Sequence, residues 1–243
     1  MTTKGILFDL YGTLIDIETD ESMEEIYRGI AHYLTYRGIH RRRWEVRDAY
    51  YRIMKEQKEA RGEEYPEIDV DAIWEAFLKQ EGMEDGPARR TLARTLAEIY
   101  RGISRKKLQL YPDVKRVLEE LRPAYPMGLV SDAQPCFALP EMTALRLEGC
   151  FDPIIISGYY GFRKPDRRLM EKALAAMKLE PAEVIFVGND MYRDIHGASR
   201  LGMKTIFFDS NQGDKVYENA SPDYTAHRFE EVLNGLKALT SLR

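Results

Sequence analysis

Five short apolar runs constrain the fold of this chain more than any other feature of its sequence. Each has five or six residues, the length of a buried strand, and the first ends abruptly at Asp9. Between the later runs, apolar residues recur at helical spacing, as over residues 114–121. Strand and helix in alternation predict an α/β fold with a parallel sheet and helices on both faces. The runs cover residues 5–9, 127–131, 153–157, 183–188 and 204–209.

Residues 15 to about 110 interrupt this alternation. They contain no convincing strand, and their apolar residues recur at helical spacing in four segments. The segments lie around residues 26–34, 46–53, 73–78 and 92–100. We therefore expect a core domain of residues 1–14 and 109–243 and an all-helical inserted domain of residues 15–108.

Charge and composition exclude several classes of protein. The 243 residues carry 36 basic and 40 acidic side chains, spread evenly, so no basic domain is present to bind nucleic acid. No apolar run approaches the roughly 20 residues that cross a bilayer, and residues 1–9 lack the layout of a signal peptide. Cys136 and Cys150 have neither metal-ligand spacing nor a disulfide framework around them. These features predict a cytoplasmic protein without a membrane or nucleic-acid partner, and they leave its oligomeric state open.

Polar side chains follow three of the predicted strands. Ligands of open parallel sheets bind outside the carboxyl ends of the strands, so these side chains mark the expected site. The loop of residues 161–166 could bring Lys164 to the same edge. Crowded carboxylates repel one another, so the cluster needs a cation such as Mg²⁺ or the Lys164 ammonium. The strand-end residues are Asp9, Ser131 with Asp132, and Asn189 with Asp190.

Four ordered motifs resemble those of the haloacid dehalogenase superfamily, and the resemblance covers the whole chain. It implies a Rossmann-like core with a helical cap inserted after the first motif, and a cap that closes over the site and shapes substrate choice. The motifs are Asp9-Leu-Tyr11-Gly12-Thr13-Leu14, then Ser131, then Lys164-Pro165, then Gly188-Asn189-Asp190 through Asp194.

The resemblance also implies roles for individual residues. Asp9 corresponds to a nucleophile that forms a covalent aspartyl intermediate, which splits one hard displacement into two easier steps. Ser131 corresponds to the hydroxyl that holds a transferring oxygen, and Lys164 to the ammonium that offsets charge on the nucleophile and the intermediate. Asp194 is expected to orient Lys164 or a metal-bound water.

Metal-dependent members of the superfamily bind Mg²⁺ beside the nucleophile. The ligands implied here are Asp9, the main-chain carbonyl of Tyr11 and an acid from the fourth motif, for which we choose Asp190 with Asn189 as the alternative. Four residues are expected to contact the substrate: Tyr11, Gly12, Thr13 and Asp132. Gly12 is also expected to form a tight turn.

Tyr11 departs from the pattern of most phosphatases of this superfamily, which carry a second aspartate two residues after the nucleophile. A phenol with a pKa of about 10 is a poor general base at neutral pH. The 2-haloacid dehalogenases of the superfamily carry a tyrosine here, because a departing halide needs no proton, and they need no magnesium. Two features favour a phosphatase instead: dehalogenases have Ser-Asn where this chain has Ser131-Asp132, and their fourth motif is less acidic.

The leading interpretation is therefore a Mg²⁺-dependent phosphatase of a small phosphorylated metabolite with an altered proton-transfer step. Such an enzyme should prefer phosphate esters with acidic leaving groups. The first alternative is a metal-independent 2-haloacid dehalogenase, whose substrate is also a small anion. The second is a catalytically weak protein that keeps the fold and uses its cap to bind a partner.

Overall fold

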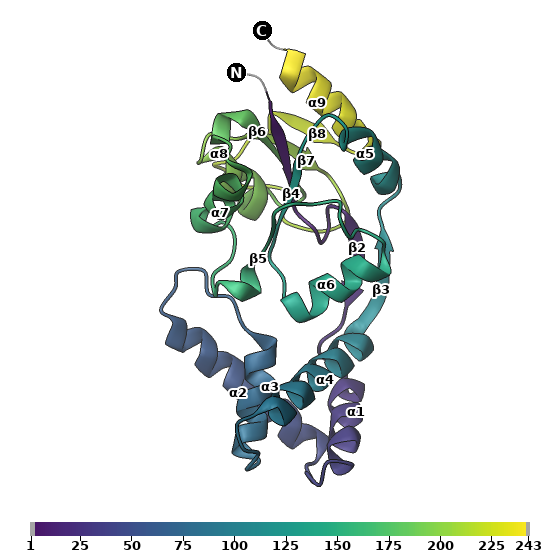
Figure 1. The fold of residues 1–243 in the computed structure, drawn as a ribbon, viewed down its shortest axis with the longest axis vertical. Coiled ribbons are helices and arrows are strands. Elements are labelled where there is room, and N and C mark those ends of the chain that lie inside the picture. Colours follow the sequence, from purple (N-terminus) through teal and green to yellow (C-terminus); the bar gives the residue numbers. More distant parts are fainter. Residues whose placement is uncertain (1–2, 242–243) are drawn as a thin grey trace.

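The computed structural model describes residues 3–241, so residues 1–2 and 242–243, assigned above to the core domain, lie outside the described part. A six-stranded sheet forms one end of the molecule and four helices form the other (Figure 1). Every neighbouring pair of strands in this sheet is parallel, which confirms the predicted α/β fold. In sheet order the strands are β5 (Ile154–Ile156), β4 (Met127–Ser131), β1 (Gly5–Phe8), β6 (Val184–Gly188), β7 (Lys204–Phe208) and β8 (Tyr224–Ala226).

Helices cover both faces of the sheet, because successive side chains of a buried strand point to opposite faces. Phe8 of the central strand packs into one cluster with α5, α6 and α9, whereas Leu7 packs into another with α7 and α8. The bounds are α5 Val114–Leu121, α6 Pro135–Ala144, α7 Arg167–Met177, α8 Gly197–Ser199 and α9 Val232–Ser241. Shorter turns of helix cover Ser157–Tyr159, Pro181–Glu183, Met191–His196 and Phe229–Glu231.

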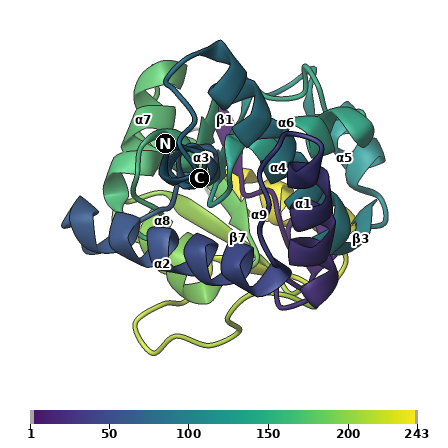
Figure 2. The ribbon, with the colours of Figure 1, turned by 90° about the horizontal axis from the view of Figure 1, so that it is seen from below.

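The inserted helices have a hydrophobic core of their own. It is centred on Trp74, which is fully buried and packs against Tyr50 and Tyr100. The four predicted helical segments are confirmed, and Figure 2 views the molecule from the end that carries them. Asp69 begins one of these helices by accepting a hydrogen bond from the main-chain N–H of Ala72. They are α1 Glu24–Thr35, α2 Arg43–Arg61, α3 Val70–Gln80 and α4 Pro87–Ser104.

The expectation that residues 15 to 110 contain no strand is wrong. β2 (Ile15–Thr19) and β3 (Arg105–Leu110) pair as an antiparallel ribbon that lies between the sheet and the inserted helices (Figure 1). Ile17 and Leu108 are partners in this ribbon and pack against the core, while polar or charged residues flank each of them. The alternation is only five or six residues long, so it is a weak signal beside the helical periodicity that surrounds it.

The inserted helices also contact the sheet-containing part away from the ribbon. The segment before α3 runs against the segment before α7: the N–H of Glu67 donates to the carbonyl of Gly161 (2.9 Å), and the N–H of Arg163 donates to the carbonyl of Tyr65 (3.0 Å). Phe137 of α6 packs into the cluster of the insert. These contacts place the insert over the carboxyl ends of the strands. Within residues 3–241, no helix has the length and apolarity that a bilayer crossing requires.

Candidate active site

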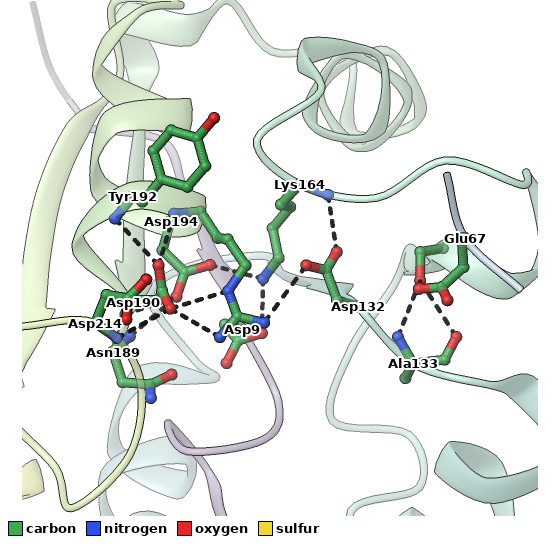
Figure 3. Close-up of polar contacts among 12 residues, drawn as sticks. Asp9, Glu67, Asp132, Ala133, Lys164, Asn189, Asp190, Tyr192, Asp194 and Asp214 are labelled. Atoms are coloured by element: carbon green, nitrogen blue, oxygen red, sulfur yellow. Dashed lines mark hydrogen bonds and ion pairs between the residues drawn. The ribbon is translucent and has the colours of Figure 1, made fainter. Parts of the chain in front are cut away.

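The strand-end residues meet at one edge of the sheet, on the side of the insert. Asp9 follows β1, Ser131 ends β4, and Asn189 and Asp190 follow β6. The loop before α7 brings Lys164 between them, and its side chain lies among the carboxylates of Asp9, Asp132 and Asp194 in Figure 3. The sequence therefore located this cluster correctly, because the carboxyl ends of neighbouring parallel strands meet at the same edge.

Lys164 links two of the carboxylates. Its Nζ lies 2.7 Å from Oδ1 of Asp9 and 2.7 Å from Oδ1 of Asp194, and it also donates to the carbonyl of Val130 at 3.1 Å. Burial alone would lower the pKa of Lys164, but the carboxylates of Asp194 and Asp9 raise it well above its usual value. Burial raises the pKa of Asp194, and Lys164 opposes that rise. Lys164 therefore stays charged beside Asp9.

Thr13 and Asn189 lie on the other side of Asp9. Thr13 Oγ1 is 2.9 Å from Oδ2 of Asp9 and 3.0 Å from Oδ1 of Asn189, so its hydroxyl can donate to either acceptor. The backbone of Gly12 has a φ of +87°, and a Cβ at that position would lie 2.3 Å from Nδ2 of Asn189. Glycine is needed there both for the turn and for the close approach of the asparagine amide.

Asp190 is held by donors of the protein itself. Its Oδ1 accepts the main-chain N–H groups of Tyr192 and Arg193, and its Oδ2 accepts the N–H of Asp214. The guanidinium of Arg193 adds two hydrogen bonds to Oδ2, at 2.9 and 2.7 Å. Burial would raise the pKa of Asp190, but these bonds from Arg193 and the amides lower it below its usual value. Main-chain amides and Arg193 thus bind both carboxylate oxygens of Asp190.

The donors beside Asp9 fit Mg²⁺ in their chemistry. Mg²⁺ prefers hard oxygen ligands and commonly takes one or two carboxylates together with water. Asn189 presents an amide oxygen close to Asp9, and Tyr11 lines the same cavity. Among residues 3–241, no three side chains of the histidine, cysteine, aspartate or glutamate type are grouped as a ready metal site. Of the two fourth-motif residues, Asn189 lies beside Thr13 and Asp9, whereas Asp190 is bound by Arg193 and by main-chain amides.

Ser131 and Asp132 each have a polar side-chain atom that makes no hydrogen bond to residues 3–241. Ser131 is fully buried, and its Oγ has no hydrogen-bond partner among the described residues. Oδ1 of Asp132 accepts the main-chain N–H of Lys164 at 2.9 Å, whereas Oδ2 has no hydrogen-bond partner within residues 3–241. Native proteins rarely leave buried polar atoms unpaired, so both atoms are candidates to contact a bound ligand.

Two adjoining cavities mark where a ligand would lie. The inner cavity, of about 180 Å³, contains Asp9, Lys164 and Asp194 in its lining. The outer cavity, of about 300 Å³, lies between the insert and the sheet and is lined by aromatic residues such as Tyr50 and Tyr100 of the insert. Both cavities share three lining residues, which form their junction. They are Tyr11, Asp132 and Arg193.

The hydroxyl of Tyr11 points to a buried ion pair. It donates to Oε2 of Glu141, and Arg101 of α4 binds both carboxylate oxygens of Glu141, at 2.7 and 3.1 Å. Burial, and then the nearby charge of Glu141, raise the pKa of Tyr11 well above its usual value. The phenol therefore keeps its proton and directs it at Glu141. This arrangement leaves Tyr11 without a role as a general base.

Several residues of the site were missed from the sequence. Arg193 lies inside the fourth motif, but nothing in the spacing indicated that it would bind Asp190. Gln212 and Gly213, which line the inner cavity, come from a loop after β7 with no motif of its own. Glu141 and Arg101 carried no signal, because a single acidic residue in a short helix and an arginine in a basic stretch are common on surfaces.

Comparisons with known proteins agree with this architecture. A family model described as a haloacid dehalogenase-like hydrolase matches residues 3–202. Among solved structures, a 2-haloacid dehalogenase from Pseudomonas syringae (TM-score 0.67, 18% identity) covers 97% of this chain and 99% of its own. A phosphatase from Thermococcus onnurineus (TM-score 0.60, 23% identity) covers 96% of this chain and 97% of its own. A magnesium-bound hydrolase from Bacillus subtilis (TM-score 0.55, 18% identity) covers 98% of this chain and 100% of its own. At these identities the structures show a shared fold.

Relatives of known activity include phosphatases and a dehalogenase. A glyceraldehyde 3-phosphate phosphatase of Pyrococcus abyssi is 34% identical over 102 residues, which are 42% of this chain and 43% of that protein, less than half of its length. A glyceraldehyde 3-phosphate phosphatase of Methanocaldococcus jannaschii is 24% identical over 97% of this chain and 98% of its own. An (S)-2-haloacid dehalogenase of Burkholderia cepacia is 24% identical over 94% of this chain and 93% of its own. The strand-end site, the helical insert and the match over residues 3–202 together show that this chain belongs to the haloacid dehalogenase-like hydrolases.

Proposed function

We propose that this chain is a Mg²⁺-dependent phosphatase of a small phosphorylated metabolite. The observation that carries the proposal is the excess of acid at the site. The buried carboxylates of Asp9, Asp190 and Asp194 and that of Asp132, whose side chain is 8% exposed, face two cations there, Lys164 and Arg193. Buried carboxylates that are not matched by cations are costly, and a divalent cation would balance them. The phosphatases among the relatives support the same choice.

In the proposed reaction Asp9 attacks the phosphorus of the substrate and forms an aspartyl phosphate. Lys164, fixed by Asp194, offsets the charge of Asp9 and of the phosphoryl group. Ser131 Oγ, which has no partner among the described residues, would donate a hydrogen bond to a phosphoryl oxygen. Asp9, the Tyr11 carbonyl and Asn189 would hold Mg²⁺, with Asp190 as the further candidate. When bound, this metal stabilises negative charge on the phosphoryl oxygens.

The insert of residues 15–108 would act as the cap that selects the substrate. It supplies the aromatic wall of the outer cavity, and Arg101 and Arg163 lie in the lining of that cavity. The small volume favours a small substrate over a macromolecule, and Arg163 is a cation of this lining that could meet an anionic group of the substrate.

A hydrolysis panel tests this function. With Mg²⁺, we expect the enzyme to release inorganic phosphate from small phosphate esters, and excess EDTA should lower the rate by about 10²-fold or more, because the metal supplies several kcal/mol of charge stabilisation. Phosphate is assayed across sugar, amino acid and glycolytic phosphates, and halide across 2-haloacids.

Two results of the panel would contradict the proposal. A 2-haloacid dehalogenase is the second candidate, favoured by the Tyr11 hydroxyl being bound to Glu141 and so unable to serve a departing alkoxide. It would release halide from 2-chloropropionate in excess EDTA and no phosphate. Absence of both products over the whole panel would favour a binding protein that keeps the fold without turnover.

A further inference from the structure

Asp132 combines a fixed position with a carboxylate oxygen that accepts no hydrogen bond. Its Oδ1 is anchored by the main-chain N–H of Lys164, while its Oδ2 accepts no hydrogen bond within residues 3–241 and has only a loose ion pair, 3.9 Å from Nη1 of Arg193. The side chain is only 8% exposed and lies in the lining of both cavities, where it points toward the space between Lys164 and Asp9 (Figure 3). Native proteins rarely leave a buried acceptor without a hydrogen bond. Such an atom at the junction of the cavities is placed to meet a ligand.

The proposed reaction lacks a proton carrier. An alkoxide that leaves phosphorus needs a proton, and the water that attacks the aspartyl phosphate must lose one. Tyr11 supplies neither, because its proton is directed at Glu141 and its pKa lies well above 10. Lys164 is held charged between Asp9 and Asp194 and has no free acceptor site. Of the carboxylates that line the inner cavity, Asp9 is the nucleophile and Asp194 is bound by Lys164 and by main-chain amides.

We propose that Asp132 is the general acid and base of this enzyme, in place of the residue two positions after the nucleophile. The inference rests on the phosphatase function proposed above. In the first step an oxygen of Asp9 bonds to phosphorus, the ester P–O bond breaks, and neutral Asp132 gives its proton to the departing oxygen, which leaves as an alcohol. In the second step the Asp132 carboxylate takes a proton from water. The water oxygen bonds to phosphorus, the bond to Asp9 breaks, and inorganic phosphate leaves with Asp132 again protonated.

The surroundings of Asp132 suit this exchange. Burial raises the pKa of Asp132 to about 6, against the opposing charges of Lys164 and Arg193, and Glu67 of the insert adds to the rise. Asp9 and Asp194 face the same inner cavity. A general acid and base is most effective when its pKa lies near the operating pH, because both protonation states are then populated. The usual aspartate pKa of about 3.9 would leave little of the acid form at neutral pH.

Asp132→Asn is the matched test, because asparagine keeps the oxygen that accepts the Lys164 N–H and removes the proton carrier. We compare an alkyl phosphate with 2,4-dinitrophenyl phosphate, whose leaving group needs no proton. The variant should lose about 10²–10⁴-fold in alkyl phosphate turnover. With dinitrophenyl phosphate it should still release a rapid burst of one phenol per enzyme, followed by slow turnover, because aspartyl phosphate then accumulates.

The pH profile separates a proton carrier from a residue that only positions Lys164. For the wild type with the alkyl ester, kcat/KM should fall as pH rises above about 6, because the acid form is lost. Asp132→Asn should lack that decline, while the ionisation of the substrate itself affects both enzymes alike. Asp16→Asn, which changes a buried aspartate that pairs with Lys107 and lines neither cavity, should leave the alkyl-to-aryl rate ratio unchanged.

Three results would overturn the inference. Equal losses for alkyl turnover and for the aryl burst would assign Asp132 to positioning alone, and retained alkyl turnover would remove it from the reaction. These two results are interpreted only after Asp9→Asn has been shown to lose the phosphate release of the wild type. They then contradict the role of Asp132 but not the phosphatase function. Absence of phosphate release from both esters by the wild type would overturn the function and the inference together. If the inference holds, the enzyme hydrolyses alkyl phosphates although it has Tyr11 two residues after the nucleophile. The sequence analysis expected a preference for phosphate esters with acidic leaving groups.

Discussion

Lys164→Met is expected to abolish turnover and to lower the free energy of unfolding by about 3–5 kcal/mol, the usual cost of removing one partner from a buried ion pair. Lys164 is 2% exposed and is the cation that separates Asp9 from Asp194. Methionine has a similar length, so the variant isolates the loss of charge from the loss of volume. Urea unfolding of both proteins at pH 7 measures the difference.

The destabilisation should also depend on pH. Without the opposing ammonium, the already raised pKa of Asp194 rises further, while the same group in the unfolded chain keeps a value of about 3.9. The folded variant then holds a proton that the unfolded chain releases at neutral pH. Its deficit relative to wild type is therefore largest at pH 7 to 8 and shrinks as pH falls toward about 4.

A surface lysine gives the control for this measurement. The ammonium of Lys172 lies over the ring of Tyr160, 4.6 Å from its centre, outside the inner cavity. Lys172→Met should change the free energy of unfolding by about 0.5 kcal/mol or less, at every pH. Equal effects of the two substitutions, or a Lys164→Met deficit that does not vary with pH, would contradict the role given to Lys164.

Asp9→Asn is expected to lower phosphate release by about 10⁴-fold or more, because removal of a covalent nucleophile leaves only binding and electrostatic contributions to the rate. Stability should fall less than in Lys164→Met, because Asp194 remains as the partner of Lys164. Phosphate assays under saturating substrate and urea unfolding on the same preparations separate the two effects.

Asp16→Asn provides a matched control for this substitution. Asp16 is a buried aspartate of β2, seven residues further along the chain, and it pairs with Lys107 of β3. It is absent from the lining of both cavities of the site. Turnover of Asp16→Asn should stay within a few-fold of wild type. A comparable loss in both variants would show that the effect of Asp9→Asn comes from disturbed packing.

The sequence was most informative where burial leaves a continuous pattern. The strands of the sheet are covered on both faces, so β1 and β6 read as apolar runs, and the polar residue after each run marks the site edge. The ribbon of β2 and β3 was missed because its strands are partly exposed and β3 begins with three basic residues. A short alternating segment beside long helices gives too little signal to separate strand from helix.

Within the site, the sequence placed residues at the edge but did not settle where their side chains point. Asn189 and Asp190 are adjacent residues after β6, and the sequence does not show which of the two side chains faces Asp9. The structure turns Asp190 toward the main-chain amides of the next turn and toward Arg193, and leaves Asn189 beside Thr13. Glu141 and Arg101 meet Tyr11 only through the packing of α4 on α6, which no local pattern encodes.

Rapid acid quench of the enzyme during turnover of a phosphate ester tests the central claim most directly. The claim is that Asp9 becomes covalently bonded to the phosphorus of the substrate. Mass spectrometry of the quenched and digested protein should find one phosphoryl group on the peptide that contains Asp9, and Asp132→Asn should increase its amount. Phosphate release at the wild-type rate with an unmodified Asp9 at every quench time, or a phosphoryl group on another residue, would contradict the account.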